Sequence, residues 1–106
     1  MRRMVDVYDV YNEGMSANAD MKRWALVFRV LANVNRLKII RFLSDGNKKN
    51  VTDITRHLGI SFKATSNHLA LLKSVNVLEA EGATGHVFYS LNQPLPADFK
   101  RALSML

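Results

Sequence analysis

The segment spanning residues 51–75 constrains the fold of this chain more than any other stretch. In its first half, three apolar residues share one face of a helix: Val51, Ile54 and Leu58. Gly59 has the backbone freedom to end that helix, and Ser61 can cap a second one. In the second helix, the face turned toward the core carries Phe62, Thr65, Leu69 and Leu72. The segment therefore predicts two short helices that meet at a tight corner, which is a helix-turn-helix.

The opposite face of the second predicted helix carries short side chains between lysines: Lys63, Ser66, Asn67, Ala70 and Lys73. Such a face suits the floor of a DNA major groove, where the hydrogen-bonding edges of the bases are exposed. An ordinary helical hairpin with a solvated polar face is the alternative. This segment alone is compatible with both.

Two β-rich runs follow the predicted helix-turn-helix. The first ends at Glu81, the second covers residues 86–91, and a glycine-bounded loop joins them. This pattern predicts a β-hairpin. A helix-turn-helix followed at once by a hairpin is a winged helix. The predicted fold class is therefore mainly α (α+β), with about five helices and a two-stranded hairpin as the wing.

Further helices are predicted on both sides of this unit. Asp20 can cap a helix over residues 21–33, and Asn35 can cap another over residues 36–45. Two prolines then open a last helix. The first and last helices each carry an apolar stripe, which either packs back on the domain or binds another copy. We expect a homodimer whose interface contains Trp24, Phe28, Phe99, Ala102, Leu103 and Leu106.

The composition narrows the class of protein. The chain has 106 residues, from which we expect one domain over residues 20–106 and an N-terminal arm over residues 1–19 that is flexible or partly helical. It has no cysteine, which excludes disulfides and thiolate ligands, and its formal charge of +6 favours a polyanionic partner. No apolar run approaches the ~20 residues of a membrane span, and the N-terminus lacks the uncharged core of a secretory signal. We expect a cytoplasmic protein without a membrane partner.

Several stretches resemble one known family. Residues 31–40, LANVNRLKII, resemble the "LANPTRLRIL" opening of the ArsR-type winged-helix repressors. Residues 58–61 and 66–73 are similar to that family's "LGLSQSTVSHHLKVLR", and residues 87–91 to its "RVYYSL" wing strand. The resemblance covers residues 24–92 in the family's order and spacing. It implies a homodimeric DNA-binding transcriptional regulator that acts as a repressor, with a dimer interface built by the first and last helices.

The chain departs from the family at its metal sites. Many members bind metals through an "ELCVCDL" motif, but here Asn50 and Thr52 stand where the cysteines would be. Other members use Asp, His and Glu on the terminal helix, and here that helix offers Asp98 without a histidine or glutamate. The three histidines, His57, His68 and His86, are dispersed along the sequence. We therefore predict no metal and no cofactor, and the effector is unknown.

The predicted wing also departs from the family, because two glutamates precede its tip and the tip has no lysine or arginine. Such a wing gains little affinity from counterion release, so we do not expect it to anchor the protein in the minor groove. We expect the attraction to phosphates to come mainly from Lys48, Lys49, Arg56, Lys63 and Lys73.

We predict individual DNA contacts for residues of the helix-turn-helix, most of them on its second helix. We assign Lys63, Ser66 and Asn67 to base edges, because lysine suits guanine acceptors and asparagine can bond adenine at two points. Four residues are expected to hold phosphates: Thr52, Arg56, His68 and Lys73. Phe62 has the phase of a core residue, so we do not assign it to a thymine methyl. Two such helices about 34 Å apart in a dimer would match a near-palindromic operator in double-stranded DNA.

The sequence bears on two other functions. A winged-helix module that binds proteins and lacks specific DNA binding is the alternative, and the acidic wing and modest charge support it. An enzyme is not expected, because the sequence has no Gly-x-Ser-x-Gly elbow, phosphate-binding glycine loop or paired carboxylates.

Overall fold

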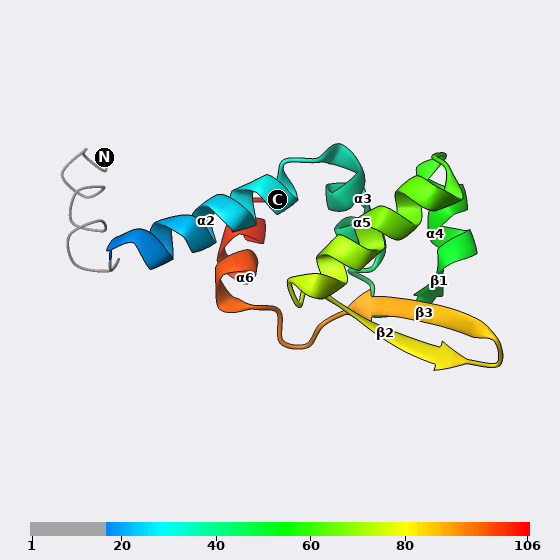
Figure 1. The fold of residues 1–106 in the computed structure, drawn as a ribbon. Helices are drawn as coiled ribbons and strands as arrows, with labels where there is room; N and C mark the ends of the chain where they lie inside the picture. Colours follow the sequence, from blue (N-terminus) through cyan, green and yellow to red (C-terminus); the bar gives the residue numbers. More distant parts are fainter. Residues whose placement is uncertain (1–16) are drawn as a thin grey trace.

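The computed structural model describes residues 17–106, with side chains from Asp20 onward. The elements follow in the order α2 (Ala17–Leu31), α3 (Val34–Phe42), β1 (Lys49–Asn50), α4 (Val51–Leu58), α5 (Phe62–Ser74), β2 (Leu78–Ala83), β3 (His86–Leu91) and α6 (Ala97–Leu103). In Figure 1, α2 and α6 lie side by side at one end of this part of the chain, and α4, α5 and the hairpin lie at the other. The predicted arm lies outside the described residues, except for its last three positions.

The predicted winged helix is confirmed, with one correction to its sheet. The sheet has three antiparallel strands in the order β1-β3-β2, where a two-stranded hairpin was predicted. The additional strand, β1, places Lys49 opposite Tyr89 and Asn50 opposite Phe88. Two residues are too few to show the alternation by which a strand is recognised in a sequence. This short strand joins the hairpin to the start of α4.

The helix-turn-helix corner forms as predicted. Asn50 caps α4, since its side chain accepts a hydrogen bond from the Asp53 backbone N–H. Gly59 ends α4 in the left-handed conformation with φ of 69°, where a side chain would be strained. Ser61 caps α5 by accepting a 3.0 Å hydrogen bond from the Ala64 backbone N–H. These caps fix the angle at which α5 leaves the corner.

Two predicted helix starts were wrong. α2 already begins at Ala17, so Asp20 lies inside its first turn and is not the cap. α3 is capped by Asn33, not Asn35, because Asn33 has the extended backbone and its Oδ1 accepts hydrogen bonds from the backbone N–H groups of Asn35 and Arg36. α3 ends at Phe42, three residues before the predicted end.

A single hydrophobic core joins all the described helices to the sheet. Its fully buried members come from α2, α3, α4, α5, the start of the hairpin and α6: Val27, Val30, Ile39, Leu43, Ile54, Leu69, Leu72, Val77, Leu78 and Phe99. α5 crosses the middle of this core with its buried face. The orientation of its other face is therefore determined by packing.

An ion pair ties α6 to α2 beside this core. Arg23 donates two hydrogen bonds to Asp98, at 2.5 and 3.1 Å, and its guanidinium lies 5.5 Å from the centre of the Phe99 ring. The hydrogen bond from Arg23 lowers the pKa of the Asp98 carboxyl and outweighs the opposing effect of burial. The charged form of Asp98 is therefore favoured in the folded protein.

This pair predicts a pH-dependent stability. Because the folded-state pKa of Asp98 is lowered, its contribution is complete above the unfolded pKa of about 3.9 and is lost as the pH falls through the folded value. We expect Asp98→Asn to lower the free energy of unfolding at pH 7 by about 1 kcal/mol, since Arg23 is partly exposed and screened. Urea unfolding at pH 7 and at about pH 2.5 measures this, and the difference between variant and wild type should shrink at the lower pH. An equal difference at both pH values would contradict the assignment.

Candidate nucleic-acid interface

The outward face of α5 holds the three residues predicted to read bases. Lys63 and Asn67 are exposed and Ser66 is half-buried beside them. The opposite face is anchored in the core by Thr65, Leu69 and Leu72, all of them fully buried. Thr65 donates its hydroxyl hydrogen to the Ser61 carbonyl at 2.9 Å, so this buried polar group has its partner. The structure thus presents a polar face flanked by lysines, on a helix whose opposite face is packed in the core.

Phe62 was expected in the core, and this prediction was wrong. Its side chain is 60% exposed. Phe62 is the first residue of α5, and side chains in a helix lean toward its N-terminus, where there is no preceding turn of α5 to cover them. It lies one turn before Ser66 on the same side of α5. Helical phase alone did not reveal that most of this side chain is left exposed.

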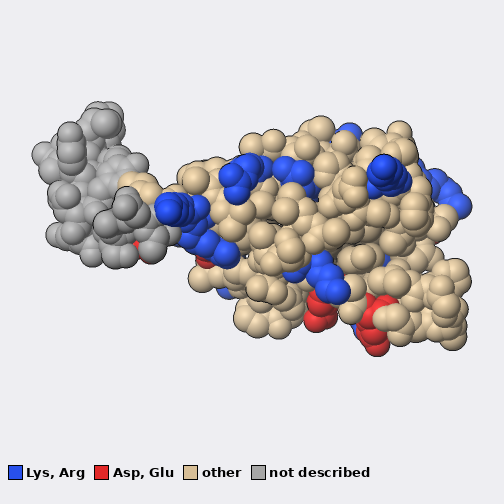
Figure 2. All heavy atoms as spheres, viewed as in Figure 1, with Lys and Arg blue, Asp and Glu red and all other residues tan. Residues whose placement is uncertain are grey.

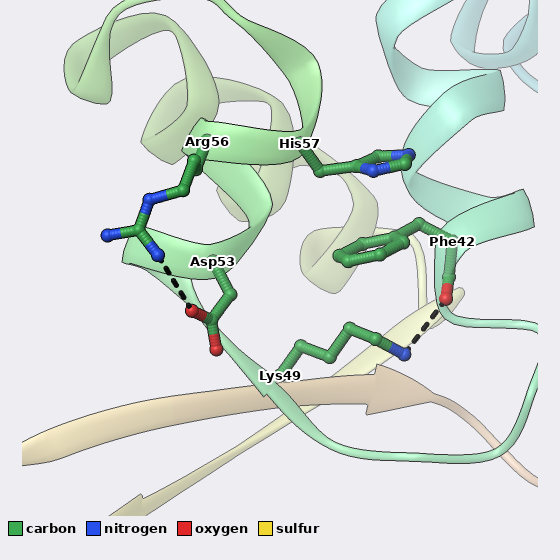
Figure 3. A pocket seen from close by; sticks show the side chains of 5 residues that line it. All are labelled: Phe42, Lys49, Asp53, Arg56 and His57. Atoms are coloured by element: carbon green, nitrogen blue, oxygen red, sulfur yellow. Dashed lines mark hydrogen bonds and ion pairs between the residues drawn. The ribbon is translucent and has the colours of Figure 1, made fainter.

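Of the predicted phosphate-binding residues, Thr52, Arg56 and Lys73 are exposed. Arg56 lies on α4, and its Nη1 is 3.7 Å from Oδ1 of Asp53, which is a loose and solvated ion pair (Figure 3). Lys73 lies on the last turn of α5. All three side chains are therefore accessible to a polyanion from solvent.

His68 is placed differently from the other predicted phosphate ligands. It is half-buried, and its Nδ1 lies 3.3 Å from Nη1 of Arg36. Burial, and secondarily the charge of Arg36, lower the pKa of His68 and favour a neutral ring. Arg36 also donates hydrogen bonds to the carbonyls of Val30 and Arg29 at the end of α2. His68 therefore connects α5 with α2, through an arginine that sequence reasoning did not single out.

Two of the lysines expected to attract phosphates already have partners within the protein. Lys49 donates hydrogen bonds to both carboxylate oxygens of Asp45 at 2.8 Å and to the Phe42 carbonyl at 3.0 Å, and its side chain is only 15% exposed. Lys48 forms an ion pair with Glu81 on β2. Lys49 is therefore less available to phosphates than expected, because its ammonium group is covered and bonded within the protein. Lys48 remains at the surface, since its ion pair with Glu81 is exposed to solvent and screened.

An aromatic stack lies next to these charges. The His57 ring lies 3.8 Å from the Phe42 ring with an angle of 6° between the planes, and the Lys49 ammonium approaches the Phe42 ring at 4.5 Å (Figure 3). Together with Asp53 and Arg56, these residues line a shallow hollow of about 360 Å³. The stack holds the end of α3 against α4, and so supports the first helix of the corner.

The hairpin has an acidic side. Glu79 and Glu81 are exposed on β2, and Figure 2 shows acidic side chains gathered at the lower edge of the molecule, where β2 lies. Basic side chains are spread over the helices in the same view. Charge therefore favours the helical face, rather than the hairpin, as the contact for a polyanion.

The predicted dimer residues divide into two groups. Phe99 is fully buried and packs inside its own subunit, whereas Ala102 is nearly buried but still lines the groove described below. Phe28 is 56% exposed and stacks on Trp24 at 5.6 Å. Phe28 also lines an apolar groove of about 300 Å³ between α2 and α6, together with Leu103 and Leu106. The exposed part of the predicted interface is therefore this groove, to which Phe99 does not contribute a lining side chain.

The described residues offer neither a metal cluster nor a membrane span. Within residues 17–106, no three His, Cys, Asp or Glu side chains are grouped closely enough to hold a metal ion. No helix in the described part of the chain is both long and apolar enough to span a membrane.

A helix-turn-helix with an exposed polar recognition face, followed by an antiparallel hairpin, defines a winged helix-turn-helix protein. Residues 33–80 match the model of the bacterial regulatory protein, arsR family. The transcriptional repressor SdpR of Bacillus subtilis is 32% identical over 72 residues, which are 68% of this chain and 79% of SdpR. The chain belongs to the ArsR family, which is a family of transcriptional regulators and not of enzymes.

Two further proteins similar to this chain are also DNA-binding or regulatory proteins by description. The cadmium resistance transcriptional regulatory protein CadC of Listeria innocua is 33% identical over 73 residues, or 69% of this chain and 61% of CadC. The solution structure of Mb0332 from Mycobacterium bovis, described as a homodimeric winged helix-turn-helix DNA-binding domain, superimposes with a TM-score of 0.67 at 25% identity. The superposition covers 86% of this chain and 85% of that structure.

Proposed function

We propose that this chain is a homodimeric repressor that binds a near-palindromic operator in double-stranded DNA through α5 of each subunit. The observation that carries the proposal is the outward face of α5, where Lys63, Ser66 and Asn67 lie together above a fully buried opposite face. Such a helix can enter the major groove without losing core contacts. The name of SdpR, a transcriptional repressor, supports the direction of regulation.

The chemistry of each side chain determines its role on DNA. Lys63 donates to the acceptors of guanine, Asn67 pairs with adenine at two points, and Ser66 bonds either base. Thr52, Arg56 and Lys73 bind phosphates around the groove and fix the position of α5 without reading sequence. His68, predicted from the sequence to bind a phosphate, instead acts by holding α5 against Arg36.

The groove between α2 and α6 is the proposed dimer interface. A second copy that inserts its own Phe28 and Leu106 would cover these exposed apolar side chains. The homodimeric Mb0332 structure supports this assembly. Twofold symmetry would then set the two copies of α5 about one helical turn of DNA apart, roughly 34 Å.

We do not propose a metal ion as the effector of this chain. CadC is named for cadmium resistance, but in this chain Asn50 and Thr52 occupy the positions of the family's cysteine motif, and neither side chain is a soft ligand. Asn50 is also engaged as the cap of α4.

Asn67→Ala tests the proposed reading of bases. We expect the variant to bind its operator more weakly by about 1–3 kcal/mol, with nearly unchanged binding to a scrambled duplex, because only the base contact is lost. The operator is obtained by selection from a random DNA pool, and affinities are measured by fluorescence anisotropy. Gln93→Ala, in the exposed loop before α6, is the control and should bind like the wild type. Equal losses on both duplexes would refute the role of Asn67.

A protein-binding module is the second candidate, and the exposed glutamates of β2, together with the pairing of Glu81 with Lys48, favour it. Titration of a fluorescent duplex at two salt concentrations separates the two functions. DNA binding through lysine and arginine weakens steeply as salt rises, since counterions are released on binding. The absence of binding in dilute buffer would support the protein-binding module instead.

A further inference from the structure

Phe62 is an exposed aromatic side chain in an otherwise polar surface. It is the one exposed large hydrophobic residue of α4 and α5 among the residues that the structure describes. It stands at the first position of α5, with Lys63 next to it and Ser66 one turn further on. Because no other large apolar side chain of these two helices is exposed around it, it does not form a patch of the size that protein partners bind.

The position of Phe62 matters because of how such helices enter DNA. The N-terminal residues of a recognition helix make the contacts with base edges in the major groove. Phe62 cannot donate or accept a hydrogen bond, so it cannot recognise the polar groups of those edges. The one apolar group that a base pair presents in the major groove is the C5-methyl of thymine.

We propose that Phe62 is a specificity-determining residue, whose ring packs against the C5-methyl group of a thymine in each half-site. This inference rests on the proposed binding of DNA through α5. It adds an apolar contact to the polar reading by Lys63, Ser66 and Asn67. Covering the ring and the methyl together removes from water an aromatic surface that is 60% exposed in the unbound protein.

Substitution of single thymines by deoxyuridine in the selected operator tests the proposal, because it removes the methyl and leaves base pairing intact. For the wild type, we expect one thymine per half-site whose replacement weakens binding about threefold to fivefold, the amount expected for one buried methyl. Replacing it in both half-sites should weaken binding roughly tenfold or more. The other thymines should tolerate the change.

Three variants make the test specific to Phe62. Phe62→Ala should bind the thymine operator more weakly and should be insensitive to deoxyuridine at the same position. Phe62→Leu should keep the sensitivity, because leucine still offers an apolar surface, whereas Phe62→Gln should lose it. Thermal unfolding confirms that the variants remain folded, as expected for an exposed residue.

The outcomes separate this inference from the proposed function. If the wild type binds its operator and responds to Asn67→Ala, but Phe62→Ala retains the full deoxyuridine penalty, the thymine contact is refuted and the proposed function stands. The same conclusion follows if no thymine is sensitive to loss of its methyl group. If no duplex is bound in dilute buffer, the proposed function and the inference fall together.

Discussion

Replacing Phe99 with alanine is expected to lower the free energy of unfolding by about 3–5 kcal/mol, the range typical for a large buried aromatic. The Phe99 side chain is fully buried between α6 and the rest of the core, and Arg23 packs over its ring. Small domains are stable by only about 5–15 kcal/mol, so this single change removes a large part of the total. Urea unfolding, followed by circular dichroism, measures the effect.

Phe62→Ala provides a matched control for Phe99→Ala, since it deletes the same atoms from an exposed position. We expect it to change the free energy of unfolding by no more than about 0.5 kcal/mol. Similar losses for the two variants would show that α6 does not close the core as the structure indicates.

Phe28→Glu is expected to dissociate the proposed dimer and, with it, to weaken operator binding by at least about a hundredfold. A carboxylate buried without a partner costs roughly 3–5 kcal/mol, and a twofold interface contains it twice. The subunit itself should remain folded, because Phe28 is 56% exposed and lies outside the fully buried core. Analytical ultracentrifugation measures the change in mass, and fluorescence anisotropy measures the change in DNA affinity.

Val87→Glu is the control for Phe28→Glu. Val87 is also an exposed apolar residue, but it lies on β3, away from the groove between α2 and α6. We expect this variant to have the same mass as the wild type. A Phe28→Glu protein that sediments as the wild type does would place the subunit contact elsewhere.

The helix-turn-helix corner could be predicted from sequence because its signals are local. Asn50, Gly59 and Ser61 act on groups within a few residues of themselves, so the residue type alone indicates the cap or the turn. The hairpin was predictable for the same reason. The cap of α3 was not, because Asn33 and Asn35 are chemically identical and only the backbone conformation selects one of them.

The site was only partly predictable, because charge pairing and burial depend on residues that are distant in sequence. Lys48 pairs with Glu81, which is 33 positions away in the sequence, and Arg36 contacts His68, which is 32 positions away. A count of basic residues therefore overestimates the cations available to DNA. Phe62 shows the converse case, in which a residue with the phase of the core is exposed because the helix begins there.

One side of α5 packs in the core, and the other is proposed to contact DNA. Because the two roles fall on different residues, the DNA preference of such a protein can change in evolution without a change in its core. Thr65, Leu69 and Leu72 hold the helix in place from within, while substitutions on the outer side are nearly neutral for stability. New target preferences can therefore arise through a few surface replacements, with no repacking of the interior. Duplicated genes that share this architecture could acquire distinct regulons early in their divergence.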